Sequence, residues 1–257
     1  MGTDGFFLID KEVGWTSFDV CAKIRKKLNI KKVGHTGTLD PFATGLLVVA
    51  TGRCTKCIPF LEKEKKTYET TLVLGKISET LDSESEVLDM PLQEGIPSQQ
   101  EIQKVLETHF QGVISQVPPQ FSAVKIKGVP AYIMARSGKK VDLSPRKVEV
   151  FKVHILSYLF PELKVSLEVS AGFYVRSFAR DLGLAFGGGA YCSALRRLKV
   201  GYLTVDDAEK ISHITQAIDP RYILMGLNLS EVGTRRVQDF IVGRDPFLCR
   251  ESKKKKF

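Results

Sequence analysis

The segment GHTGTLDPFATGLLVVA, residues 34–50, decides how the rest of the sequence is interpreted. Three glycines and a proline within its first twelve residues predict a rigid, tightly turned loop, and the apolar run LLVVA predicts a buried strand. Asp40 is the only carboxylate of the loop, and Pro41 biases it toward extended geometry. The loop matches neither GxxxxGK[ST] nor GxGxxG, so it is not a familiar nucleotide-binding loop. Taken alone, Asp40 could equally be a plain turn residue.

On the N-terminal side of this loop, FFLID (6–10) predicts a buried strand. Thr16 or Ser17 can cap a helix that follows, with Asp19 near its positive end. The residues at helical spacing, which predict the buried face, are Phe18, Cys21, Ile24 and Leu28. The opposite face and the residues after it are basic and predict either a solvated surface or a phosphate track. These basic residues are Lys23, Arg25, Lys26, Lys27, Lys31 and Lys32.

On the C-terminal side, strand patterns at 66–75, 147–159 and 163–171 alternate irregularly with helices. Ser98 and Glu101 form a capping box before a helix that runs to His109, and a second helix is predicted at 173–186. The acidic stretch 78–89 is expected to be an exposed loop. Because strands and helices do not alternate regularly, the sequence predicts an α+β fold with a mixed, largely antiparallel sheet flanked by helices.

The balance of 38 Lys+Arg against 29 Asp+Glu gives a formal net charge of +9. A surplus of this size favours a polyanionic partner such as a nucleic acid. No stretch is long and apolar enough for a membrane span, and the N-terminus has no basic segment typical of a signal peptide. The odd, scattered set of five cysteines indicates a reducing compartment, so we expect a cytoplasmic protein. Cys54 and Cys57 form a CxxC without a second ligand pair, so no metal site is predicted.

Five segments then stand in one order and spacing. They are GHTGTLDPFATGLL (34–47), KKTY (65–68), PPQFSAVKIKG (118–128), GFYVRSFARDLG (172–183) and LRRL (195–198). This set resembles the TruB-type family of tRNA pseudouridine synthases over roughly residues 6–211, and five ordered segments are far more specific than one motif. The resemblance implies the pseudouridine synthase fold and an enzyme that isomerises uridine at position 55 in the T-loop of tRNA. It also implies no cofactor, no metal, and a monomer without an obligate protein partner.

By the same resemblance, Asp40 corresponds to the catalytic aspartate of the family. Tyr68 corresponds to the tyrosine that stacks on the flipped base, and Arg176 to the arginine that pairs with the catalytic carboxylate. The residues implied in substrate binding are His35, Tyr174, Leu195 and Lys11. Arg196, Arg197 and Lys199, with the basic residues at 23–32, are expected to hold phosphates.

The sequence departs from the family pattern near both ends. Glu12 follows Lys11 where the family usually has proline, and Phe173 stands where the family has threonine. We expect a catalytic domain at 1–227, followed at 228–257 by a short remnant of a PUA-type RNA-binding module with a lysine tail.

Two other functions fit parts of the sequence. An RNA-binding or RNA-folding protein without chemistry would use the same basic surface, but it would not need an ionised aspartate together with Tyr68 and Arg176. A pseudouridine synthase that works through a guide RNA is a second alternative. The guide-dependent relatives carry a complete PUA module and additional N-terminal sequence, and we expect neither in this protein.

Overall fold

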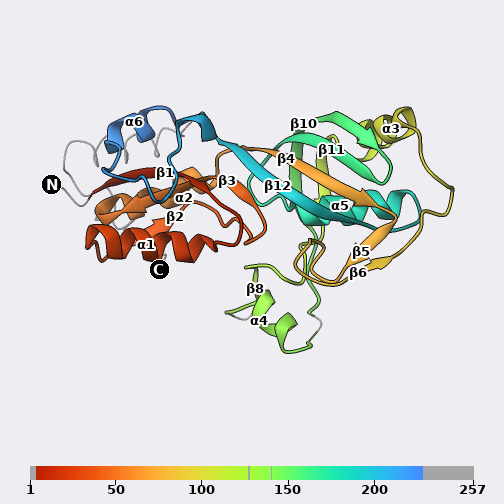
Figure 1. Ribbon diagram of the computed structural model, residues 1–257, viewed down its shortest axis with the longest axis horizontal. Coiled ribbons are helices and arrows are strands. Elements are labelled where there is room, and N and C mark those ends of the chain that lie inside the picture. The colour runs from red at the N-terminus through yellow and green to blue at the C-terminus, as the bar shows by residue number, and fades with distance from the viewer. Residues whose placement is uncertain (1–3, 127, 140, 228–257) are drawn as a thin grey trace, which may run out of the picture. The chain divides into compact units, whose positions relative to one another are not determined.

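The computed structural model describes residues 4–126, 128–139 and 141–227, and it divides them into two compact units (Figure 1). Unit 1 comprises residues 4–40, 45–64 and 200–227, and unit 2 comprises 41–44 and the described residues from 65 to 199. The predicted remnant at 228–257 lies outside the described residues, so the predicted domain boundary stays a prediction.

Unit 1 is a small sheet with helices on both faces. Its strands are β1 (Gly5–Lys11), β2 (Val33–His35), nearly all of β3 (Thr44–Thr51) and β13 (Leu203–Thr204). Its helical segments are α1 (Ser17–Leu28), η1 (Gly52–Cys57), α2 (Ile58–Glu62), η2 (Val205–Asp207) and α6 (Pro220–Met225). Strands β1 and β2 both pair antiparallel with β3. This β3 strand is the LLVVA run that the sequence predicted to be buried.

Both faces of the β1–β3 pair are buried, which explains why their sequences are continuous apolar runs. On one face, Phe6 and Val48 join a core with Ile223 and Leu224 of α6. The alternate residues, such as Phe7, point to the opposite face and are buried as well. Helix α1 begins at a capping box between Thr16 and Asp19, as predicted.

The cysteines of the CxxC pair belong to this core. Cys54 and Cys57 are 0% and 1% exposed, and they pack among the apolar residues of unit 1. Burial raises the pKa of each thiol to about 12. Because the thiolate is the reactive form, both are core residues rather than reactive groups.

Unit 2 is built on five strands in the order β12–β4–β11–β10–β7 (Figure 1). Their bounds are β4 (Lys66–Leu74), β7 (Gly112–Gln116), β10 (Arg146–Leu159), β11 (Glu162–Val169) and β12 (Ala190–Val200). Two small hairpins are added, β5 (Lys76–Ser78) with β6 (Val87–Asp89) and β8 (Lys125–Ile126) with β9 (Val129–Pro130). The helices are α3 (Gln99–His109), α4 (Ala131–Arg136) and α5 (Val175–Ala185).

The strand pairing confirms the predicted α+β class. Antiparallel pairing joins β1 with β3, β2 with β3, β4 with β11, β10 with β11, and β7 with β10. Parallel pairing occurs at isolated bridges, Ile9 with Glu209 and Asp82 with Cys192. The capping box of Ser98 and Glu101 at the start of α3 is also confirmed. None of the described helices is both long and apolar enough to cross a membrane.

Three sequence-based expectations are wrong. Helical spacing predicts that Phe18 lies on the inner face of α1, but Phe18 is 68% exposed, and Ser17 and Val20 are buried instead. The stretch 78–89 is not simply an exposed loop, because Asp82 is only 1% exposed. Arg197 is also 1% exposed, so it cannot hold a phosphate at the surface. In each case, tertiary packing overrides a pattern that is only local.

Candidate active-site residues

Unit 1 contains His35, Asp40 and Lys11. His35 is the last residue of β2, and the N–H of Thr36 then donates to the carbonyl of Val48 at 2.9 Å. Gly37 has φ of +96°, a left-handed conformation that favours glycine. The β2 ladder and this turn place the loop after His35 at the end of the sheet. Asp40 follows five residues after His35 and is half-buried.

Lys11 has a buried position at the end of β1. Its side chain is 1% exposed, and its ammonium group donates to the carbonyls of Trp15 at 2.7 Å and Glu12 at 3.1 Å. These contacts brace the turn between β1 and α1. Direct contact of Lys11 with a substrate stays a prediction.

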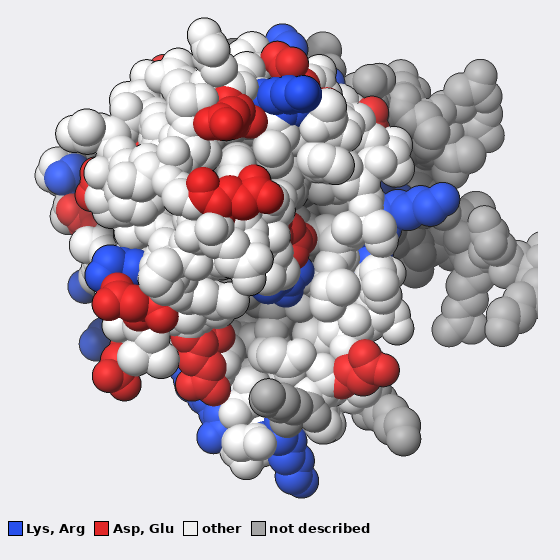
Figure 2. All heavy atoms as spheres, turned by 90° about the vertical axis from the view of Figure 1, so that its right-hand side faces the viewer, with Lys and Arg blue, Asp and Glu red and all other residues white. Residues whose placement is uncertain are grey.

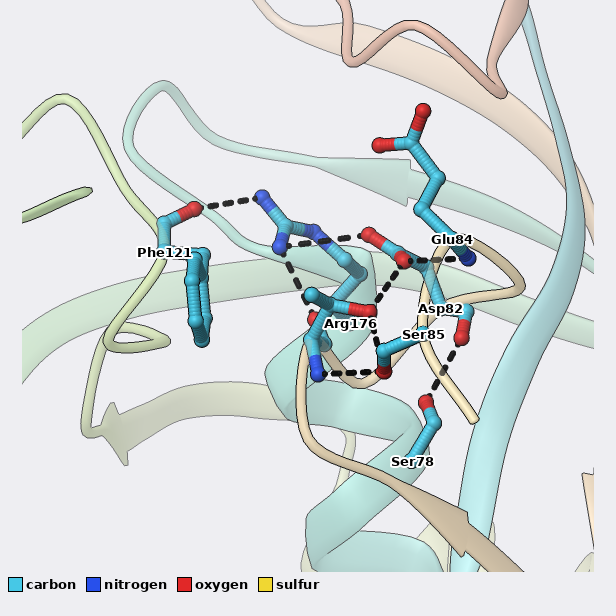
Figure 3. A network of polar contacts seen from close by, with 7 residues as sticks. Ser78, Asp82, Glu84, Ser85, Phe121 and Arg176 are labelled. Carbon is cyan, nitrogen blue, oxygen red and sulfur yellow. Dashed lines mark hydrogen bonds and ion pairs between the residues drawn. The ribbon is translucent and has the colours of Figure 1, made fainter. Parts of the chain in front are cut away.

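Unit 2 contains the other predicted residues, and Arg176 is the centre of a buried polar network (Figure 3). Its Nη1 donates to the carbonyl of Thr80 at 2.9 Å and lies 3.3 Å from Oδ2 of Asp82. Its Nη2 donates to the carbonyl of Phe121 at 2.9 Å. The side chains of Arg176 and Asp82 are 5% and 2% exposed, so this ion pair is almost completely removed from water.

Asp82 is itself held by its own segment (Figure 3). Its Oδ1 accepts from the N–H of Glu84 at 3.0 Å and from the hydroxyl of Thr80. Its backbone carbonyl accepts from the Ser78 hydroxyl at 2.6 Å. The N–H of Cys192 on β12 donates to the carbonyl of Leu81, which ties the segment to the sheet. Contacts within its own segment therefore hold the Asp82 carboxylate in place. The ion pair with this carboxylate in turn gives the Arg176 guanidinium one well-defined position.

Tyr174 precedes α5 and is fixed through its backbone. The side-chain amide of Gln116, at the end of β7, accepts from the Tyr174 N–H at 2.8 Å and donates to its carbonyl at 3.0 Å. Gln116 is 2% exposed. The Tyr174 side chain packs against the apolar cluster of Val124, Ala131 and Leu143. The start of α5 is thus attached both to the sheet and to the segment that carries α4.

Tyr68 and Leu195 lie on strands of the same sheet. Tyr68 is 9% exposed on β4, opposite Leu167 of β11. It shares its face of β4 with Thr70, whose hydroxyl donates to the carbonyl of Ala194 on β12 at 2.8 Å. Leu195 is 8% exposed on β12. Unit 2 thus contains Tyr68, Tyr174, Arg176 and Leu195, on β4, β12 and the start of α5, and unit 1 contains Lys11, His35 and Asp40.

Asp82 and Gln116 are not recognisable from the sequence as residues that support the site. Asp82 stands in a stretch with several other acids, and no local signal separates it from them. Gln116 is the last residue of β7, and nothing in the sequence of that strand marks it as important for the site. Among the residues that the structure describes, no three His, Cys, Asp or Glu side chains are grouped so that they could hold a metal ion.

Basic side chains line a surface pocket of about 550 Å³ in unit 1. The cations are Lys31, Lys32, Arg53 and Lys56, and Asp4 also lines the pocket. The face of the molecule shown in Figure 2 differs, because there basic and acidic side chains are interspersed and broad areas carry no charge. In this pocket Arg53 and Lys56 lie beside Lys31 and Lys32, for which the sequence predicted either a solvated surface or a phosphate track.

The chain is similar to one family and to several named proteins. The family model described as "TruB family pseudouridylate synthase (N terminal domain)" matches residues 25–175. The tRNA pseudouridine synthase B of Geobacter sulfurreducens is 43% identical over 217 residues, which are 83% of this chain and 71% of that protein. The protein of the same name from Aquifex aeolicus is 41% identical over 86% of this chain and 77% of its own length.

Solved structures show a related fold. "Crystal Structure of a Cbf5-Nop10-Gar1 Complex" contains a chain that matches with a TM-score of 0.61 and 31% identity over 79% of this chain and 50% of that chain. "Structure of H/ACA RNP bound to a substrate RNA containing 2'-deoxyuridine" matches with a TM-score of 0.61 and 26% identity over 88% of this chain and 56% of that chain. The protein described here spans about half the length of these two chains.

Proposed function

The chain belongs to the TruB family of pseudouridylate synthases, and on that premise we propose that it isomerises the uridine at position 55 in the T-loop of tRNA, with Asp40 as the catalytic carboxylate. The protein is a pseudouridine synthase that acts on tRNA. What we propose is that the modified uridine is at position 55 and that Asp40 is the catalytic carboxylate. The observation that carries them is loop 34–45, inside the matched range, with Asp40 as its one acid.

The chemistry requires an ionised group at the sugar. The N1–C1′ bond of the uridine breaks, the uracil rotates, and a C5–C1′ bond forms while the proton from C5 is transferred and N1 gains one. Departure of the base leaves electron deficiency at the sugar, and a carboxylate can attack C1′ or promote elimination. Because the reaction is an isomerisation, atoms and electrons balance without an oxidant or reductant. Asp40 fits this role because its loop offers no other acid.

The target base must leave its stack to react. Unstacking costs a few kcal/mol, and stacking on an aromatic side chain can offset that cost. We assign stacking on the flipped base to Tyr68 and assistance of extrusion to His35. Tyr174 and Leu195 are assigned to the wall that holds the base. Arg176 is assigned to stabilising the reacting charges, because its fixed guanidinium needs little reorganisation during the reaction.

The first test is to locate the modified nucleotide. An unmodified tRNA transcript incubated with the protein should gain one pseudouridine, at position 55, and a transcript with cytidine at that position should gain none. Modification at another uridine would overturn the assignment of the T-loop. A protein that binds the transcript but leaves every uridine unchanged would support the RNA-binding or RNA-folding alternative.

The basic pocket of unit 1 is proposed to hold phosphates of the tRNA, because phosphate contacts supply much of the affinity in protein–nucleic acid complexes. Lys56→Gln should weaken binding to all tRNA sequences alike, and it should reduce the slope of log affinity against log salt by about 1. The measurement is a salt titration of the dissociation constant. Lys104→Gln, an exposed lysine on α3, is the matched control. An unchanged slope in Lys56→Gln would remove Lys56 from the interface.

A further inference from the structure

One hydroxyl group holds both backbone groups of the residue before Asp40. The Ser17 Oγ accepts from the N–H of Leu39 at 2.8 Å and donates to the carbonyl of Leu39 at 3.1 Å. Ser17 and Leu39 are each 2% exposed, so both hydrogen bonds are shielded from water. Buried backbone groups need such partners, and here a side chain 22 residues away supplies them.

The position of Ser17 is fixed by its own neighbours. It is the first residue of α1, and the capping box beside it joins the Thr16 hydroxyl to the N–H of Asp19 at 3.0 Å. The Asp19 carboxylate in turn accepts from the N–H of Thr16 at 3.0 Å. One residue earlier, the carbonyl of Trp15 accepts from the buried ammonium of Lys11. The hydroxyl that holds Leu39 is therefore attached to a well-anchored helix start.

Peptide geometry transmits this restraint to Asp40. The carbonyl of Leu39 and the N and Cα of Asp40 lie in one peptide plane, so a hydrogen bond that fixes the carbonyl oxygen also orients the Asp40 backbone. On the other side, Pro41 restricts the conformation available to Asp40. The carboxylate is thus carried by a backbone that is restrained from both directions.

We propose that Ser17 is a positioning residue for the isomerisation, and that its hydroxyl keeps the Asp40 carboxylate where the reaction needs it. This inference rests on the proposed role of Asp40. A displacement of about 1 Å in a reacting group can reduce a rate by about 10²-fold, although binding is unchanged. The Ser17 hydroxyl therefore acts on the chemical step and not on tRNA affinity.

The experiment compares Ser17→Ala with Thr16→Ala. The first variant removes the hydrogen bonds to Leu39, and the second removes the capping hydroxyl of the same helix without touching Leu39.

Three quantities are measured on each full-length protein: the single-turnover rate of pseudouridine formation, the dissociation constant for tRNA, and hydrogen exchange of a peptide that covers residues 34–45. Ser17→Ala should lower the rate by about 10²-fold, keep the dissociation constant within about twofold, and accelerate amide exchange in the peptide by roughly tenfold. Thr16→Ala weakens the helix start but keeps both hydrogen bonds from Ser17 to Leu39, so it should change the rate and the peptide exchange far less than Ser17→Ala does.

Two outcomes would overturn the proposal. A wild-type rate in Ser17→Ala would show that the hydroxyl does not position Asp40. Equal losses of rate in Ser17→Ala and Thr16→Ala would show that the effect comes from the stability of α1. If the wild-type protein forms no pseudouridine, the proposed function fails instead, and the exchange comparison still decides whether Ser17 holds the loop.

Discussion

The Asp40→Asn variant should form pseudouridine at least ~10³-fold more slowly than the wild-type protein, because the amide cannot act as the ionised group at the sugar. The substitution preserves size and shape, so the loop should keep its fold. Affinity for tRNA should stay within about threefold, since most binding energy comes from phosphate contacts made elsewhere. The measurement is a single-turnover assay with the tRNA transcript, combined with a binding titration on the same preparation.

The control for this prediction is Asp207→Asn, which makes the same chemical change at an exposed residue of η2 in the same unit. It should keep the wild-type rate. If Asp40→Asn retained more than a tenth of the wild-type rate, Asp40 would not be the catalytic carboxylate. If it lost tRNA binding as well, the loop would have to be assigned to substrate binding.

Asp82→Asn should destabilise the protein by about 3–5 kcal/mol, because it breaks a buried ion pair in which the Asp82 carboxylate lies 3.3 Å from the Arg176 guanidinium. The hydrogen bonds from Arg176 to the carbonyls of Thr80 and Phe121 do not involve the substituted group. The expected change corresponds to a fall in Tm of roughly 10 °C. Thermal or denaturant unfolding measures it, and the rate of pseudouridine formation should fall because the guanidinium loses its fixed position.

An exposed ion pair supplies the comparison. Lys76 and Asp89 approach to 3.0 Å, but their side chains are 44% and 77% exposed. Asp89→Asn should therefore change the free energy of unfolding by less than about 1 kcal/mol. The two variants differ in burial and not in the chemical change. If they destabilised the protein equally, the network around Arg176 would be no more important for stability than a surface contact.

The order of five segments was sufficient for the sequence to predict the family, which the comparisons then confirmed. The α+β class and the capping boxes at Thr16 and Ser98 were also predicted correctly. The family follows from the order of segments along the chain, whereas the capping boxes depend on residues within about four positions of one another and the elements on the spacing of their apolar residues. Each of these depends on sequence order or on short-range spacing, so it can be recognised without knowing the tertiary structure.

Tertiary structure alone decided which polar groups are buried. Asp82 stood among several equivalent acids until a guanidinium 94 positions away in numbering gave it an ion-pair partner, and Arg176 donates to a carbonyl 96 residues away. The Ser17 hydroxyl looked like one of two possible helix caps, but it bonds the backbone of Leu39 instead. A buried polar group is stable only where it has hydrogen-bond or ion-pair partners. Here the tertiary fold supplies these partners from distant segments, so a pattern of a few neighbouring residues does not predict them.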